Sequence, residues 1–233
     1  MPDRSTTHHS TTNAVAQTLL TYEQEAETFL KQWARKRYKR PALLKEWVAL
    51  LPSWAVVLDL GCGAGQDARC LASLGYRVVG LDRTHPLLRF AKGRKASLPF
   101  VQADMRALPI RAGRLDGIWA VASLMHVPKP VAQQVLKTLR DCVRPDGLLA
   151  ATVTHGWHSR INTEGWMPGR YFARWKKDEL ARAFARAGWQ VLSLCVVSNR
   201  ERKGRWINVI ARAGKPCPSL SPYKRMAIWS SSC

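Results

Sequence analysis

Three glycines and an acidic residue form the part of the sequence best suited to hold a nucleotide-like molecule. The stretch VVLDLGCGAG at residues 56–65 places Gly61, Gly63 and Gly65 after an apolar run that is interrupted by Asp59. Glycine accepts positive φ and has no Cβ, so a ligand can approach the backbone closely at such positions. A strand that enters a glycine turn and then a helix is a common way to hold a cofactor of this kind.

Two further acids end the next two predicted strands. Asp82 ends residues 76–82 and suits hydrogen bonds to paired ribose hydroxyls, although dehydrogenases also use an acid there. Asp104 ends residues 99–104 and can accept a hydrogen bond from an exocyclic amine such as that of adenine. A dinucleotide-binding loop reads G-x-G-x-x-G, and Gln66 stands where its third glycine belongs. A nicotinamide dehydrogenase is therefore disfavoured.

Alternating strands and helices must position these side chains. From residue 55 the pattern of strand, turn and helix repeats five times, and residues 189–197 and 205–212 then read as a terminal hairpin around NRERKG. This order predicts an α/β fold with one doubly wound, mostly parallel sheet. In such sheets the ligand binds beyond the carboxyl ends of the strands, which is where the glycines and acids lie.

The chain is long enough for one domain with modest extensions. Its start is polar, its end is rich in proline and serine, and apolar residues recur at helical spacing before the first strand. The predicted divisions are a disordered lead-in at 1–14, one α/β domain at 15–213 and a flexible tail at 214–233. Within the domain we expect a helical cap at 15–50, a cofactor-binding half at 55–152 and a substrate-side half at 153–213.

The run VVLDLGCGAG, with Asp82, Asp104 and RPDG at 144–147, resembles the class I S-adenosylmethionine-dependent methyltransferases over about residues 55–212. This resemblance implies a Rossmann-like sheet of seven strands with the last one antiparallel. It also implies S-adenosyl-L-methionine as cofactor and in-line transfer of its methyl group to an O, N or S acceptor.

The same resemblance assigns the cofactor-binding residues. The backbone at Gly61 and Gly63 would pass under the methionine part and the ribose, Asp82 would bind the ribose hydroxyls, and Asp104 with the amide of Met105 would hold the adenine. Asp59 would contact the cofactor or order the loop, and both roles stay open. The implied set is Tyr22, Asp59, Gly61, Cys62, Gly63, Gly65, Asp82, Asp104, Met105 and Ala120.

His126 in SLMHVPKP is the candidate catalytic residue, because it follows the fourth strand on the side where the transferred methyl should point. Histidine titrates near neutral pH and can take a proton from a hydroxyl, amine or thiol acceptor. The alternative is that it only bonds the backbone at a strand-to-helix junction. We expect a His126→Ala variant to retain its turnover.

Rings gather in the irregular stretch between the fifth strand and the last helix. They form either an aromatic lid over an apolar or planar acceptor, with Tyr22 capping the cofactor from the N-terminal helix, or a set of side chains that fix a long connection to the sheet. These rings are His155, Trp157, His158, Trp166, Tyr171 and Phe172.

The chain is strongly basic, with 37 lysines and arginines against 16 acids and a formal net charge of +21. Such a surface attracts polyanions with an affinity that falls as salt rises. No RNA-binding signature accompanies the charge, so a small-molecule acceptor is favoured over RNA. An RNA or tRNA methyltransferase and a non-catalytic cofactor-binding protein remain the alternatives.

The six cysteines contain no CxxC pair. This spacing disfavours a disulfide framework and a metal site, and it predicts a cytoplasmic protein. No window approaches 18 uninterrupted apolar residues, so no membrane partner is expected.

Overall fold

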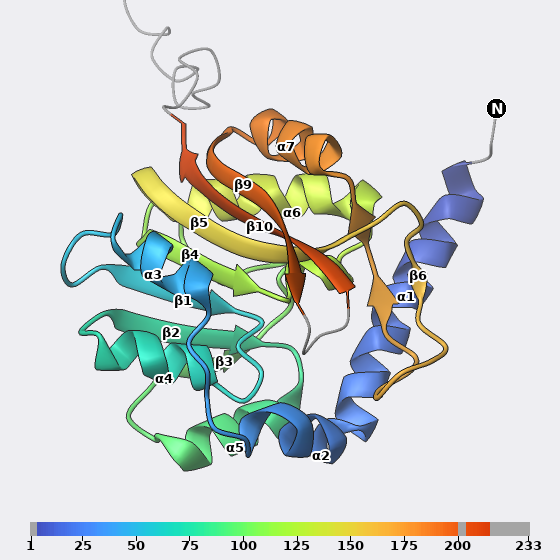
Figure 1. The fold of residues 1–233 in the computed structure, drawn as a ribbon, viewed down its shortest axis with the longest axis horizontal. Coiled ribbons are helices and arrows are strands. Elements are labelled where there is room, and N and C mark those ends of the chain that lie inside the picture. The colour runs from blue at the N-terminus through green and yellow to red at the C-terminus, as the bar shows by residue number, and fades with distance from the viewer. Residues whose placement is uncertain (1–3, 200–203, 215–233) are drawn as a thin grey trace, which may run out of the picture.

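A mixed β-sheet forms the centre of the computed structural model, which describes residues 4–199 and 204–214 (Figure 1). From one edge to the other its strands are β3 (Phe100–Gln102), β2 (Arg77–Asp82), β1 (Val56–Leu60), β4 (Leu115–Val121), β5 (Val143–His155), β10 (Gly204–Ala213) and β9 (Trp189–Asn199). Strand β10 is antiparallel to both of its neighbours, and the other adjacent pairs along this order are parallel. The sheet confirms the predicted Rossmann-like fold with an antiparallel last strand.

Helices cover both faces of the sheet, which explains why β1 and β4 are apolar on both sides. Alternate residues enter separate cores: Val57 packs toward α3, α4 and α5, whereas Leu58 and Leu60 pack toward α6 and α7. The helices are α3 (Ala42–Val48), α4 (Gln66–Ser73), α5 (His85–Arg94), α6 (Lys129–Cys142) and α7 (Lys177–Arg186).

The N-terminal cap begins earlier than the sequence pattern predicted. Helix α1 (Arg4–Gln24) starts inside the stretch 1–14, so the expected disorder is wrong from Arg4 onward. No glycine or proline interrupts this helix, and its second half is fixed where Thr18 Oγ1 accepts a hydrogen bond of 2.9 Å from the Tyr171 amide. Two short turns complete the cap, α2 (Ala26–Phe29) and the π-helical turn η1 (Leu30–Ala34).

The connection between β5 and α7 folds back along the sheet. Strand β6 (Arg160–Ile161) pairs with β7 (Tyr171–Phe172), and β8 (Arg174–Trp175) pairs with the end of β5. Figure 1 shows this connection beside α1, at the end of the sheet where β5 leaves it. It therefore forms one wall at that end of the molecule.

The RPDG motif is part of strand β5. Residues 144–147 lie within β5 as an irregularity, because Leu115 pairs with Val143 while Gly117 pairs with Leu148. Asp146 has a φ of 62°, which lets the strand take up the extra residues.

Two expectations concern residues that are mostly undescribed. The predicted tail at 214–233 lies outside the described residues apart from Gly214, and so does most of the NRERKG loop. Among the helices that are described, none has the length and apolar character needed to cross a membrane.

Candidate active site

A cavity of about 680 Å³ lies at the carboxyl ends of β1, β2, β3 and β4, between these strand ends and α1 with the β5–α7 connection. It brings together most of the predicted site residues, although they come from positions 22 to 126 of the sequence. Those that line it are Tyr22, Gly61, Cys62, Gly63, Asp82, Asp104, Met105 and His126. The residues that line the cavity form two sides.

The glycine loop forms part of the first side, which we call the loop side (Gly61, Gly63, Asp82, Thr84 and Asp104). Gly61 has a φ of 73°, and a Cβ on it would lie 2.4 Å from the Cβ of Ser123. Only glycine fits there, because a side chain would be both strained and overlapped. The loop is thus pressed against the segment that follows β4.

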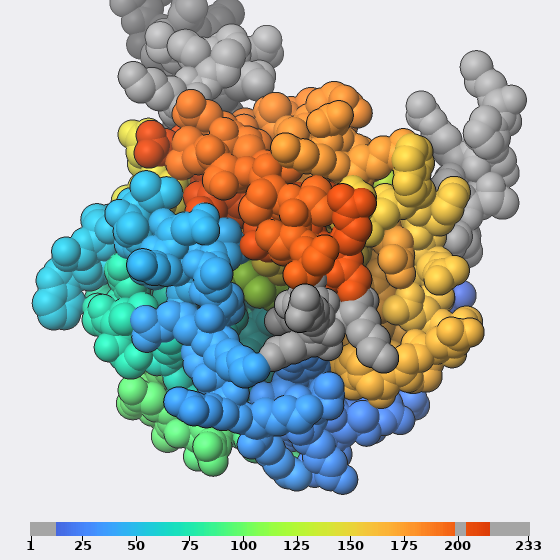
Figure 2. Space-filling view, in the orientation of Figure 1, coloured from blue at the N-terminus to red at the C-terminus, as the bar shows by residue number. Residues whose placement is uncertain are grey.

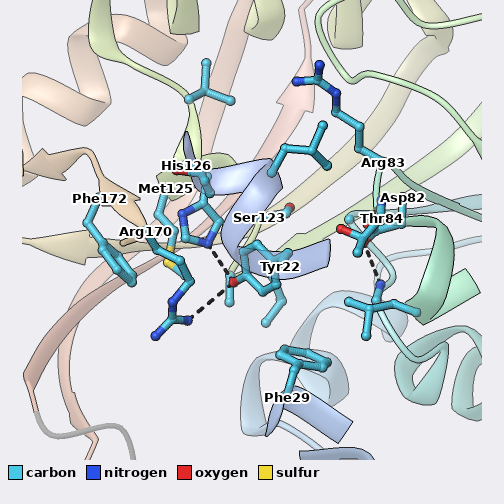
Figure 3. Close-up of a pocket in the computed structure, with 18 of the residues that line it drawn as sticks. Tyr22, Phe29, Asp82, Arg83, Thr84, Ser123, Met125, His126, Arg170 and Phe172 are labelled. Atoms are coloured by element: carbon cyan, nitrogen blue, oxygen red, sulfur yellow. Dashed lines mark hydrogen bonds between the residues drawn. The ribbon is translucent and has the colours of Figure 1, made fainter. Parts of the chain in front are cut away.

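Asp82 fastens this loop to the one after β2. One carboxylate oxygen accepts a hydrogen bond of 2.8 Å from the Gly63 amide, and the other accepts one of 2.8 Å from the Thr84 amide (Figure 3). Burial raises the pKa of Asp82, and these two amides oppose the rise. Each carboxylate oxygen has a second lone pair, so Asp82 keeps the capacity to accept hydrogen bonds from ligand hydroxyls.

Asp104 lies at the far end of the loop side and is already paired. The Arg106 guanidinium donates to both of its carboxylate oxygens, at distances of 2.6 to 3.1 Å, and Arg83 lies 3.3 Å away. Burial alone would raise the pKa of Asp104, but the hydrogen bonds from Arg106 outweigh it and hold the pKa below its ordinary value. A ligand amine here would share the carboxylate with Arg106.

Three residues of the implied cofactor set do not line the cavity. Asp59 is buried behind the loop, with Oδ2 lacking a hydrogen-bond partner in the described chain, and burial followed by the charge of Asp67 raises its pKa. A Cβ on Gly65 would lie 2.8 Å from the Phe100 ring, so this glycine serves close packing. Ala120 is fully buried in the core, and the cavity wall begins one residue later at Val121.

Cys62 lies in the loop with its side chain mostly buried. Burial, followed by the nearby charge of Asp59, raises the pKa of its thiol well above the ordinary value. A thiol in that state is a packing group and a poor nucleophile.

His126 stands on the second side of the cavity, which we call the aromatic side (Tyr22, His126, Trp166, Arg170 and Phe172). Its Nδ1 lies 2.7 Å from the Tyr171 carbonyl, which fixes the proton on Nδ1 because a carbonyl only accepts. Nε2 is then the acceptor for the Tyr22 hydroxyl at 3.0 Å (Figure 3). Burial, reinforced by the charge of Arg170, lowers the pKa of His126 from 6.5 to about 4. The ring is therefore neutral at pH 7.

Arg170 completes the aromatic side and was not singled out from the sequence. Its side chain is buried, with Nε donating to the Met167 carbonyl at 2.9 Å and the guanidinium 4.4 Å from the Trp166 ring. Ser123, whose buried Oγ has no partner in the described chain, and Thr84 were also missed. The sequence did offer one signal for Arg170, which is an arginine beside aromatic residues in the irregular stretch GRYF at 169–172.

The six rings of the β5–α7 connection do not act together. Trp166 and Phe172 line the cavity, whereas Trp157 is 71% exposed and carries the Lys176 ammonium 3.2 Å from its ring centre. Tyr171 contributes its carbonyl rather than its ring to the site, through His126. In the described chain no cluster of His, Cys, Asp and Glu side chains is suited to hold a metal ion.

Comparison with known proteins agrees with this geometry. Residues 57–147 match the family described as the methyltransferase domain. The chain is 38% identical over 98 residues to a malonyl-[acyl-carrier protein] O-methyltransferase of Pseudescherichia vulneris, covering 42% of this chain and 38% of that protein. It is 34% identical over 167 residues to a ubiquinone biosynthesis O-methyltransferase of Methylobacterium sp. (strain 4-46), covering 64% of this chain and 66% of that protein. The chain thus spans between about two fifths and two thirds of these relatives.

A solved structure extends the likeness to nearly the whole fold. The 1,6-didemethyltoxoflavin-N1-methyltransferase of Burkholderia thailandensis, solved with 1,6-didemethyltoxoflavin and S-adenosylhomocysteine bound, superposes with a TM-score of 0.71. The match covers 92% of this chain and 93% of that one. Because the two sequences are only 21% identical, the match supports a shared fold alone. Residues 57–147 therefore belong to the methyltransferase domain family, and the sheet that they help to build has the fold of the class I S-adenosylmethionine-dependent methyltransferases.

Proposed function

We propose that this protein transfers a methyl group from S-adenosyl-L-methionine to a small molecule that enters the cavity from the aromatic side. The observation that carries the proposal is the Asp82 carboxylate, which ties the glycine loop after β1 to the turn after β2 at the wall of a cavity of about 680 Å³. That volume lies within the range of pockets that enclose small ligands. The cavity also continues past the loop side to Phe172 and Arg174, which leaves room for an acceptor.

The loop-side residues fit the cofactor. In this proposal Asp82 accepts hydrogen bonds from the ribose hydroxyls, Asp104 and the Met105 amide hold the adenine, and the unpartnered Ser123 Oγ is available to a polar group. When bound, S-adenosylmethionine supplies a methyl group on a sulfonium, which is already activated for displacement. The protein then has to hold the acceptor in line with that methyl and exclude water, and good alignment contributes about 7–11 kcal/mol.

The aromatic side suits positioning better than proton removal. A base whose pKa is about 4 is a weak proton acceptor at neutral pH, and Nε2 of His126 is already engaged by the Tyr22 hydroxyl. We therefore assign His126 to the placement of Tyr22, in line with the expectation that a His126→Ala variant keeps its turnover. An acceptor that is a thiol or a neutral amine needs no base.

The test of the function is direct binding by isothermal titration calorimetry. We expect S-adenosylmethionine and S-adenosylhomocysteine to bind and NAD not to bind. Asp82→Ala should weaken binding by about ten- to a hundredfold, because a charge-assisted hydrogen bond contributes about 1.5–3 kcal/mol. The matched control is Asp178→Ala, at an exposed position on α7. Binding of NAD, or an unchanged affinity in folded Asp82→Ala, would contradict the proposal.

A second candidate acceptor is RNA, which one observation favours. A groove of about 660 Å³ adjoins the cavity, shares Gln32, Trp33 and Gln66 with it, and is lined by basic side chains of residues 36–40. Figure 2 shows the hollow between this N-terminal segment in blue and the orange-red strands β9 and β10. The basic residues that line the groove are Lys36, Arg37, Lys39 and Arg40.

The RNA reading is tested by changing that charge. Replacing Arg35, Lys36, Arg37, Lys39 and Arg40 with glutamine should lower RNA affinity and flatten the slope of its salt dependence if RNA binds there. We expect RNA binding to be weak and non-specific in both proteins. Equal binding by the variant and the wild type assigns these charges to a solvated face.

A further inference from the structure

Arg170 is a buried cation surrounded by aromatic rings instead of acids. Its exposed fraction is 7%, and its guanidinium lies 4.4 Å from the Trp166 ring centre, 5.2 Å from that of Phe172 and 5.6 Å from that of Tyr22. Among the described residues no carboxylate forms an ion pair with it. Glu164 lines the same cavity but is exposed and not paired with Arg170.

The hydrogen bonds of Arg170 leave much of its guanidinium available. A guanidinium carries five N–H donors in a planar fork. Nε uses one on the Met167 carbonyl, and Nη1 makes only a long contact of 3.4 Å with the Tyr22 hydroxyl. Figure 3 shows the end of the side chain in the cavity, between Phe172 and Tyr22. The remaining donors therefore face the space that the acceptor would fill.

A buried cation without a counter-charge is unfavourable, because burial removes the water that would solvate it. Rings near a guanidinium offset part of this cost, but they supply no hydrogen-bond acceptors in the plane of the fork. A carboxylate or phosphate would supply both the charge and the paired oxygens that match the fork.

We propose that Arg170 binds an anionic group of the methyl acceptor, a carboxylate or phosphate, and so selects acidic acceptors. This inference rests on the proposed function, because it names the substrate class of the same cavity. Arg170 then acts as an anchor, with Trp166 and Phe172 holding the guanidinium plane in place. The acceptor atom would lie between this anchor and the loop side.

The inference is tested by calorimetry on the full chain saturated with S-adenosylhomocysteine. The probes are benzoate and benzamide, which share size and ring but differ in charge. We expect benzoate to bind at least tenfold more tightly than benzamide to the wild type, and Arg170→Met to remove that preference. Arg170→Lys keeps the positive charge but lacks the planar fork of the guanidinium, and it should retain part of the preference for benzoate. Arg182→Met, at an exposed position on α7, is the control and should match the wild type.

Two results of this probe comparison overturn the inference. One is equal binding of the two probes by the wild type, including no detectable binding of either, and the other is a preference that survives in Arg170→Met. The wild-type comparison and Arg170→Lys still decide the question if Arg170→Met does not fold.

The cofactor's own carboxylate is the competing partner for Arg170. Methylthioadenosine lacks that carboxylate, so its affinity is compared with that of S-adenosylhomocysteine in both proteins. We expect Arg170→Met to change both affinities by less than twofold. A tenfold loss for S-adenosylhomocysteine alone would assign Arg170 to the cofactor and overturn the acceptor role. Failure of the wild type to bind S-adenosylhomocysteine would instead overturn the proposed function.

Discussion

The two sides of the cavity are built in different ways. On the loop side, Gly61, Asp82 and Asp104 lie at or just after the carboxyl ends of neighbouring strands, and backbone amides hold the carboxylate of Asp82. On the aromatic side, side chains far apart in the chain hold one another: Tyr22 and His126 are 104 residues apart, and Tyr22 and Arg170 are 148 apart. The first side is fixed by sheet topology, whereas the second depends on how α1 and the β5–α7 connection pack.

The loop side should be intolerant of any added atom at Gly61. Gly61→Ala places a Cβ 2.4 Å from that of Ser123 at a φ of 73°, and strain with overpacking should lower the free energy of unfolding by about 2–5 kcal/mol. Urea unfolding measures this loss. Gly75→Ala is the matched control, because its φ is 92° and nothing lies within 4 Å of the added Cβ. Equal losses in the two variants would show that strain alone acts and that contact with Ser123 is unimportant.

The aromatic side should show a pH dependence that comes from His126. Its pKa is about 4 in the folded protein and 6.5 ordinarily, so between these values the unfolded chain binds a proton that the folded chain does not. Stability is therefore retained above pH 6.5 and falls by about 3 kcal/mol as the pH drops toward 4. Urea unfolding measured at several pH values between 4 and 7 checks this loss of stability.

His126→Asn removes the titration while keeping a donor for the Tyr171 carbonyl. Near pH 7 we expect this variant to be about 1 kcal/mol less stable than the wild type, for the lost hydrogen bond with Tyr22. Near pH 4 the order should reverse, because only the wild type then carries the cost of the unprotonated ring. Two curves that stay parallel would place the pKa of His126 near its ordinary value.

The hydroxyl of Tyr22 tests how strongly the aromatic side is connected. Tyr22→Phe removes the contacts with Nε2 of His126 and with Arg170 and keeps the ring. We expect a loss of about 1 kcal/mol in the free energy of unfolding. The affinity for S-adenosylhomocysteine should change by less than threefold, since the loop side keeps its own hydrogen bonds. A large loss of cofactor affinity would mean that the two sides are coupled.

The smallest effect is expected at Arg106. Its ion pair with Asp104 is partly exposed, with 31% of the Arg106 side chain and 24% of the Asp104 side chain accessible. Arg106→Gln should therefore change the free energy of unfolding by less than about 1 kcal/mol. Asp104→Ala should weaken cofactor binding far more than Arg106→Gln does. Equal effects on cofactor binding would show that Asp104 serves only to hold Arg106.

Some elements could be predicted because local pattern decides them. The terminal hairpin and helices α4, α5, α6 and α7 follow from apolar spacing, glycine and proline, and all are present. The helix at residues 4–14 was not predicted, because this polar sequence has no apolar face of its own. The contact that anchors α1 is made at Thr18 by the distant Tyr171 amide. The place of RPDG inside β5 is not a local feature of the sequence, because a turn-like sequence can be accommodated as an irregularity between two strands.

The sequence by itself determined the loop side, since a strand end, a glycine and an acid are local features that parallel topology brings to one edge. It did not separate Gly61 and Gly63, which line the cavity, from Gly65, which only admits the Phe100 ring. Only the tertiary structure decided the aromatic side. The pKa of His126 depends on burial, on the Tyr171 carbonyl and on the charge of Arg170, and none of these is visible near residue 126 in the chain. Contacts over more than a hundred residues carry no periodic signal, so packing alone brings Tyr22, His126 and Arg170 together.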